Sequence, residues 1–235
     1  MPFVEKLLGY KSVSFVGMEK NAGKTQTLNY VLNRLRSFSD VSLAISSIGI
    51  DGEQVDQVTE TAKPEITIFK GTKFVTAQAL YRQKEITACI ESVSRQSTAL
   101  GRLITARAVS DGKVLLAGPS GTKQLKEYID RLSHEVDLCL IDGALSRMSF
   151  GSPCITDAMI LSTGAAVSAS LPTMVAKTRF TYELIQLPKF QGDNIEDLKK
   201  KENGIFAVTD SEIIDLDIPS LLMIDRYKDR IFEHG

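Results

Sequence analysis

The chain has 235 residues, of which 43% are hydrophobic and 24% are charged, so it can bury a sizeable core without disulfides or a structural metal. Its formal net charge of -1 argues against nucleic acid as the main partner, and no apolar stretch approaches the ~18 residues of a membrane span. Three cysteines without CxxC spacing fit a reducing cytoplasm, and two histidines are too few for a histidine metal cage or a Ser/His/Asp hydrolase.

The first part of the chain has the pattern of a strand, a loop, a helix and a second strand. Residues 12–16 form a short apolar run, and residues 41–48 form another. Between them, residues 23–38 are predicted to be helical, because apolar side chains recur at helical spacing at Leu28, Val31, Leu32 and Leu35. A unit of this kind favours parallel strands joined by a right-handed crossover.

Residues 66–117 have a different pattern, which predicts a small, mainly antiparallel β insert. Its expected strands are residues 66–69, 87–93, 103–108 and 114–117, with a turn signal at 110–112. The βα alternation then resumes, with helices at 123–132 and 172–185 and strands at 136–141, 158–161, 205–208 and 221–224. We therefore predict a single domain over residues 1–235, with an α/β fold and a doubly wound, mainly parallel sheet.

The segment 17–25, GMEKNAGKT, connects the first expected strand to the first expected helix. A phosphate needs several converging N–H donors, and a loop that leads into a helix N-terminus supplies them together with the positive end of the helix dipole. Lys24 would place its ammonium group between the terminal phosphates, and the Thr25 hydroxyl would bind the Mg²⁺ that bridges them. The candidate nucleotide-binding residues are Lys20, Asn21, Ala22, Gly23, Lys24, Thr25 and Gln26.

One feature of this segment departs from the G-x-x-x-x-G-K-[ST] pattern of a phosphate loop. Met18 occupies the first glycine position, and Gly17 lies one residue earlier, so the first turn of the loop must suit a methionine. The alternative to a phosphate site is a strand–helix connection that happens to contain glycine, lysine and threonine.

Asp142 is a further candidate, because it ends the apolar run at 136–141 and is followed by Gly143. A carboxylate at the carboxyl end of a central strand faces the phosphate loop, where it can hold Mg²⁺ through water. Asp51 follows the second strand and would arrive at the same edge. The alternatives are a capping aspartate at 142 and a plain turn at 51. The candidate catalytic residues are Lys24, Asp51 and Asp142, and the candidate metal ligands are Thr25, Asp51 and Asp142.

Two segments of small residues could line the same edge of the sheet. Residues 118–122, GPSGT, open the helix expected near 123, either as a second anion site or, as we prefer, with Ser120 or Thr122 capping the helix. Residues 162–165, STGA, follow the strand at 158–161, and the alternative there is a tight turn.

Three stretches of sequence, VGMEKNAGKT, IGIDGE and LCLIDGA, carry a resemblance to a known family. The chain resembles the branch of P-loop NTPases that includes metallochaperone and cobalamin-chaperone GTPases, dethiobiotin synthetase and the molybdenum-cofactor accessory protein. The resemblance implies that these positions bind phosphates, Mg²⁺ and the attacking water. The base-reading N/T-K-x-D sequence is missing, and Val208-Thr209-Asp210 departs from it, so ATP and GTP both stay open.

A narrower resemblance concerns the loop together with TALGRLITARAVSDGKVLLAGPSGT. These stretches are similar to small accessory proteins that restore adenosylcobalamin-dependent amino-acid aminomutases. Lys20 also invites comparison with loops whose extra lysine reaches across a homodimer. There the lysine directly follows the first motif position, where this chain has Glu19, so an exposed lysine is the alternative.

The function expected from these features is a slow, Mg²⁺-dependent NTPase that acts on a client enzyme, for example by reactivating or loading a cobalamin- or metal-dependent enzyme. The alternative is an ATP-dependent metabolic enzyme resembling dethiobiotin synthetase, with a small-molecule substrate. A third reading is a module that senses nucleotide without hydrolysing it.

Overall fold

The structure is a computed structural model, and it describes residues 3–49, 66–119, 121–143, 155–188, 192, 194–201, 204–209, 212–218 and 226–233. The chain divides into two compact units, Met1–Phe180 and Thr181–Gly235. In the described part of the first unit the helices are α1 (Phe3–Leu7), α2 (Lys24–Leu35), α3 (Gln78–Tyr81) and α4 (Thr122–Glu135). Helix α5 (Leu171–Ile185) runs across the division between the units. The prediction of a single domain over residues 1–235 stays a prediction.

The strands of the first unit are β1 (Ser12–Gly17), β2 (Leu43–Ser47), β3 (Ile66–Ile68), β4 (Lys73–Ala77), β5 (Ala88–Thr98), β6 (Gly101–Ala108), β7 (Gly112–Val114), β8 (Leu138–Asp142) and β9 (Ala158–Ser162). In the described residues, seven of them form one sheet in the order β5-β6-β4-β2-β8-β1-β9, while β3 and β7 form a separate antiparallel pair. From β4 to β9 all neighbours are parallel, and β6 and β5 extend the sheet in antiparallel fashion. The mixed α/β fold with a mostly parallel sheet is therefore as predicted, and it is compatible with a doubly wound arrangement.

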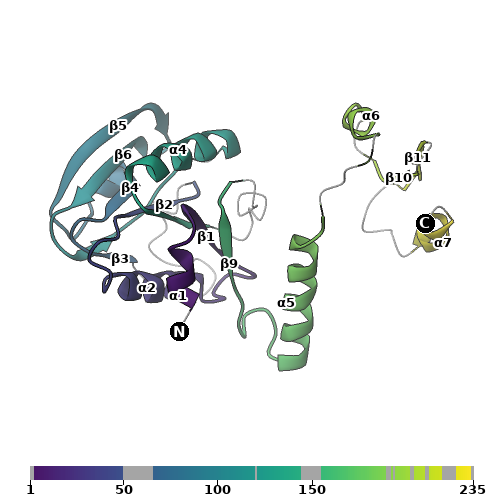
Figure 1. Cartoon of the computed structure of the whole chain (residues 1–235), viewed down its shortest axis with the longest axis horizontal. Helices are drawn as coiled ribbons and strands as arrows, with labels where there is room; N and C mark the ends of the chain where they lie inside the picture. Colours follow the sequence, from purple (N-terminus) through teal and green to yellow (C-terminus); the bar gives the residue numbers. More distant parts are fainter. Residues whose placement is uncertain are drawn as a thin grey trace. The chain divides into compact units, whose positions relative to one another are not determined.

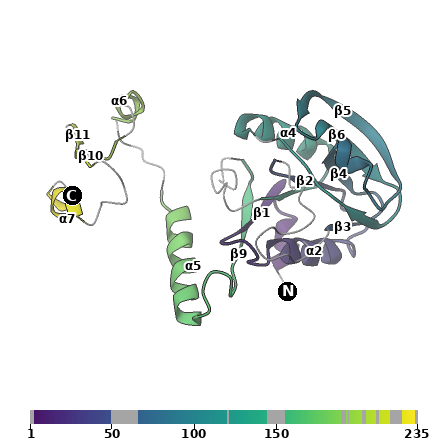
Figure 2. The same ribbon diagram turned by 180° about the vertical axis from the view of Figure 1, so that it is seen from behind.

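The insert predicted at 66–117 differs from what the structure shows. Its β5–β6 hairpin is antiparallel, as expected, but it continues the main sheet at the edge opposite β9 (Figure 2). Strand β4, which the sequence did not predict, pairs in parallel with β2 and so belongs to the central sheet. Residues 66–117 are thus partly an extension of the central sheet.

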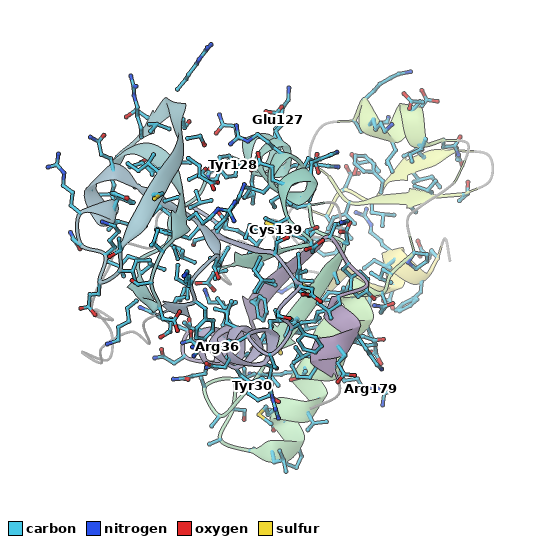
Figure 3. All side chains as sticks on the ribbon, turned by 60° about the vertical axis from the view of Figure 1, so that its left-hand side comes forward. Tyr30, Arg36, Glu127, Tyr128, Cys139 and Arg179 are labelled. Atoms are coloured by element: carbon cyan, nitrogen blue, oxygen red, sulfur yellow. The ribbon has the colours of Figure 1, made fainter. Side chains whose placement is uncertain are left out.

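Helices cover the two faces of this sheet. Helices α1 and α2 lie on one side, over a core that includes Phe15, and α4 lies on the other, over a core that includes Ile129 and Cys139 (Figure 1). Figure 3 shows the same division, with Tyr30 of α2 far from Tyr128 of α4. The predicted apolar face of α2 is confirmed, since its four residues are all buried: Leu28, Val31, Leu32 and Leu35. Burying each such side chain stabilises the fold by about 1.5–3 kcal/mol.

Two matching aspartate–serine pairs join parallel strands at their amino ends. The Asp157 carboxylate accepts hydrogen bonds from the backbone N–H and the hydroxyl of Ser12, and Asp137 accepts the same pair of bonds from Ser42. In return, each aspartate N–H donates to the serine hydroxyl at 3.0 Å. The Ser42 hydroxyl and N–H lower the pKa of Asp137, because they stabilise its charged form. These pairs lie at or next to the first residues of β1 and β9 and of β2 and β8, and they are consistent with the register of those strands.

The buried Lys73 of β4 forms ion pairs with one residue of α4 and one of β5. Lys73 Nζ lies 2.5 Å from a carboxylate oxygen of Glu135 and 3.1 Å from one of Glu91. The other carboxylate oxygen of Glu91 lies 2.6 Å from Arg107 Nε. Burial alone would lower the pKa of Lys73, but its hydrogen bonds with Glu135 and Glu91 outweigh burial and raise it. Burial alone would raise the pKa of Glu91, but hydrogen bonds from Lys73 and Arg107 outweigh burial and lower it.

The lowered pKa of Glu91 predicts an acid-dependent contribution to stability. A carboxyl group whose pKa is lower in the folded state stabilises the protein fully above its unfolded pKa of about 4.3, and the contribution disappears as the pH falls through the folded pKa. We expect Glu91→Gln to lower the midpoint of urea unfolding at pH 7 and to have a smaller effect in each step towards pH 3. A difference between parent and variant that is constant over this range would contradict the assignment. Arg95→Gln, which removes a charge from the exposed part of β5, is the control.

The second unit contains short elements in its described residues: α6 (Ile195–Lys199), β10 (Phe206–Val208), β11 (Ile213–Asp215) and α7 (Lys228–Phe232). The strand expected at 205–208 pairs antiparallel with β11 and not with the main sheet. The strand expected at 221–224 lies outside the described residues. Across the described part of the chain, no helix combines the length and the hydropathy needed to cross a membrane.

Candidate phosphate and metal site

The segment between β1 and α2 contains a tight turn with two residues in the left-handed backbone conformation. Gly23, the N-cap residue of α2, has φ 88° and ψ 10°, and Asn21 also has a positive φ of 63°. Between them, the Ala22 N–H donates to the Glu19 carbonyl oxygen at 3.1 Å, which closes a turn. Left-handed residues in a turn orient successive N–H groups toward a common point, where they can bind an anion. The loop ends at Lys24, the first residue of α2, where the positive end of the helix dipole lies.

Met18, the departure from the phosphate-loop pattern, is accommodated without strain. Among the described residues other than glycine, only Asn21 and Asp217 have positive φ, so Met18 keeps a conformation common for its type. Its N–H donates to the Ser162 carbonyl oxygen of β9 at 2.9 Å. Gly17 is the glycine that the loop approaches closely, since a Cβ there would lie 3.2 Å from the Glu19 carbonyl oxygen. The first turn therefore differs from the standard pattern in the way that the sequence required.

The loop is supported from β9 by residues that the phosphate-loop motif does not include. The Ser162 hydroxyl donates to the Thr27 hydroxyl at 3.3 Å, and Thr27 donates to the Gly23 carbonyl oxygen at 3.1 Å. A Cβ on Gly164 would lie 3.7 Å from the Ala22 carbonyl oxygen. Residues 162–164 thus lie beside the loop, which was one of the two alternatives that the sequence left open for this segment, whereas the role of Thr27 was missed.

Asp142 ends β8 between the two strands that lead to the candidate site. It is in register with Phe15 of β1 on one side and with Ser47 of β2 on the other. Its carbonyl oxygen accepts the Ile48 N–H at 2.9 Å, and the following Gly143 N–H donates to the Phe15 carbonyl oxygen at 2.9 Å. The carboxyl ends of these three parallel strands are therefore held together, and Asp142 lies at the centre of that edge.

Lys24 and Asp142 form an ion pair. The lysine Nζ and the aspartate Oδ1 are 2.7 Å apart, and the two side chains are 18% and 5% exposed. The glycine-lysine-threonine segment and the strand-ending aspartate are more than a hundred residues apart in sequence, yet they meet at one point. The prediction that Asp142 faces the loop agrees with this geometry.

The remaining predicted site residues are distributed over the loop and the first turn of α2. Lys20 and Asn21 are exposed, as is Gln26 in the helix, while Ala22 is buried. Gly23 and Thr25 are half-buried on either side of Lys24. Asp51, predicted as a catalytic residue and a metal ligand, lies outside the described residues.

The oxygen donors at this edge suit a magnesium ion in part. Mg²⁺ prefers oxygen ligands and keeps several waters, so it needs few protein ligands. Of the predicted ligands, Asp142 places a carboxylate beside Lys24. Nowhere in the described ranges do three or more His, Cys, Asp or Glu side chains gather around a common point. Cys139 packs in the apolar core that includes Ile129, where burial raises the pKa of its thiol to about 12.

The segment before α4 differs in detail from its prediction. Helix α4 begins at Thr122, and its N-cap residue is Gly121, without a side-chain cap hydrogen bond. Ser120 lies outside the described residues. Gly118 and Pro119 instead pair with the end of β2, because the Gly118 N–H donates to the Gly49 carbonyl oxygen and the Gly49 N–H donates to the Pro119 carbonyl oxygen. This segment lies against the end of β2, one strand further from the loop than Asp142.

Comparisons with protein-family models, with curated protein sequences and with solved structures find no match for this chain. What defines the site is its own geometry: a mostly parallel α/β sheet, a left-handed glycine before a helix, and a lysine paired with a strand-ending aspartate. These features are the basis of the functional proposal that follows.

Proposed function

We propose that the chain binds a nucleoside triphosphate together with Mg²⁺, at the loop between β1 and α2. The observation that carries this proposal is the 2.7 Å contact between Lys24 and Asp142, made where a loop with two left-handed residues enters a helix. An anion site and a carboxylate for a cation are then neighbours, as phosphoryl chemistry requires. Neither feature alone would be sufficient, since a glycine-containing strand–helix connection is common.

Each residue has a separate role in this proposal. The backbone N–H groups of residues 20, 21 and 23–25 bind phosphate oxygens, while that of Ala22 stays bonded to the Glu19 carbonyl oxygen, and Lys24 supplies the positive charge that the terminal phosphates need. Thr25 and Asp142 hold the metal ion, directly or through water, and Asp51 is proposed to act with them. The metal ion, when bound, neutralises charge on the phosphates. Because α2 and β8 are both anchored in the core, these groups are held in place by rigid elements.

We further propose that the chain is a slow NTPase that acts on a client enzyme. The support for this step is the resemblance of its motifs to accessory P-loop NTPases, among them those that serve cobalamin-dependent aminomutases. In this proposal, binding of the triphosphate would order the segments that follow β2 and β8, most of which lie outside the described residues, and hydrolysis would release them. Homodimer formation through Lys20 is part of the same proposal.

A titration panel tests the binding step. ATP, GTP and CTP are titrated with and without Mg²⁺, and we expect one purine nucleotide to bind tightest and to require the metal. Failure of all three to bind in the presence of Mg²⁺ would remove the proposal. Nucleotide turnover is then measured with fractionated cell extract: stimulation by a protein fraction supports the accessory role, and stimulation by a small-molecule fraction supports a metabolic enzyme.

A further inference from the structure

The two groups expected to receive a phosphate and a metal ion are bound to each other. Lys24 Nζ and Asp142 Oδ1 are 2.7 Å apart. We infer that this ion pair is a closed form of the site, which opens for a triphosphate and a divalent cation together and resists either one alone. The inference rests on the proposed function, because it specifies the form of ligand that the same site accepts.

Burial makes this ion pair costly to break. The Lys24 side chain is 18% exposed and the Asp142 side chain 5%. Removing one partner from a buried ion pair is strongly unfavourable, because the other charge loses a close opposite charge in a poorly solvated place. Water therefore cannot replace either partner as well as it could at the surface.

Each ligand alone replaces only one half of the ion pair. A metal-free triphosphate attracts Lys24 but leaves the Asp142 carboxylate next to additional negative charge. A divalent cation alone attracts Asp142 but leaves the Lys24 ammonium next to a like charge. A triphosphate and a cation together compensate both groups at once, so the pair opens without leaving a buried charge.

The backbone on both sides of the ion pair is fixed. The Asp142 carbonyl oxygen accepts the Ile48 N–H, and the Gly143 N–H donates to the Phe15 carbonyl oxygen, both at 2.9 Å. Lys24 begins a helix that is hydrogen-bonded from its first turn. A shift of strand or helix that separated the two charges would break these bonds, so opening consists of rotation of the two side chains.

Competition for one ion pair couples the two ligands thermodynamically. If the cation raises the affinity for the triphosphate by some factor, the triphosphate raises the affinity for the cation by the same factor. We expect that factor to be at least about 10, within the usual range for coupled sites.

The test begins with the parent protein. Isothermal titration measures the affinity for the best nucleotide of the panel with Mg²⁺ and with a chelator, and electron paramagnetic resonance measures Mn²⁺ binding with and without that nucleotide. Strong and equal coupling in both directions is the expected result. Tight binding of the metal-free nucleotide, with a coupling factor below about 3, would overturn the inference without affecting the proposed nucleotide site.

Two variants and two charge-matched controls then separate the ion pair from net charge. Asp142→Asn should raise the affinity for metal-free nucleotide roughly 10-fold and remove most of the coupling. Glu19→Gln, which removes an exposed carboxylate from the loop, should change the affinity for metal-free nucleotide far less. Lys24→Gln should raise the affinity for Mn²⁺ in the absence of nucleotide, and Lys20→Gln, which removes a lysine from the same loop, should not.

The outcomes distinguish the inference from the function on which it rests. If each variant and its control shift affinity by the same factor, net charge accounts for the effect and the closed form is wrong. If the parent binds no nucleotide even with Mg²⁺, the proposed function itself is wrong. Circular dichroism establishes that each variant is folded, and the measurements on the parent protein decide the question if a variant is not.

Discussion

Replacing Lys24 with alanine is expected to lower the affinity for a Mg²⁺-bound triphosphate at least about 100-fold, because the phosphates lose a charge-assisted partner at the helix N-terminus. The substitution leaves the left-handed Gly23, the loop backbone and the proposed metal ligands Thr25 and Asp142 in place, so any remaining affinity measures what the backbone N–H groups and the metal contribute without the lysine. Titration of a fluorescent nucleotide, followed by competition with the unlabelled one, gives the ratio of the two affinities.

Lys20→Ala is the matched control for this loss, since it removes an equal charge from the same loop. It should lower the affinity only a few-fold if Lys20 is simply exposed, because surface charges act through screened interactions. A Lys20 effect as large as that of Lys24 would instead support the homodimer. Equal binding by parent and Lys24→Ala would show that the loop is only a strand–helix connection.

The sequence predicted the central part of the fold correctly because its pattern is local and strong. Helix α2 has apolar residues at helical spacing, and strands β1 and β8 are short buried runs that end at Gly17 and Asp142. The order of the strands in the sheet could not be predicted from such local patterns. Strand β8, distant in sequence, lies between β1 and β2, and only long-range pairing determines that position.

Strand β4 was missed because its pattern is weakened by a buried charge. Lys73 begins the strand, and a lysine normally indicates an exposed position. Here Glu91 and Glu135 compensate its charge, and neither lies near it in sequence. Strand β5 was predicted too short for a related reason: it is an edge strand with irregular pairing to β6, so polar residues occur on both its faces.

The candidate site could be predicted as far as its motifs are local. The lysine and threonine after a glycine are visible in the sequence, and so is an aspartate at the end of an apolar run. That Lys24 and Asp142 form an ion pair, and that Ser162 and Thr27 support the loop, depends on strands β8 and β9 flanking β1. A serine at the end of a strand carries no signal of its own that distinguishes support of a loop from an ordinary turn.

Gly118→Ala is expected to destabilise the first unit by about 3 kcal/mol, which corresponds to a fall of roughly 6–12 °C in the midpoint of thermal unfolding. A Cβ at this position would lie 1.8 Å from the Ser47 carbonyl oxygen and 2.9 Å from the Ser46 hydroxyl oxygen. The nearest atom belongs to the backbone of a central strand, so it cannot move aside by a change of rotamer. The strand end and the segment before α4 must separate, and the hydrogen bond between the Gly118 N–H and the Gly49 carbonyl oxygen is lost.

Gly121→Ala is the matched control, because a Cβ there would first meet the flexible Gln124 side chain at 3.5 Å. It should lower the unfolding midpoint by only about 2–4 °C, because alanine at the N-cap of α4 costs about 1 kcal/mol relative to glycine. The alanine side chain of Gly118→Ala would displace Ser47, which is in register with Asp142. The variant should therefore also bind Mg²⁺ and nucleotide more weakly than the control. If both variants unfold at the same temperature as the parent, the close contact between residue 118 and β2 is wrong. If Gly118→Ala loses stability but keeps full affinity, the end of β2 does not position Asp142.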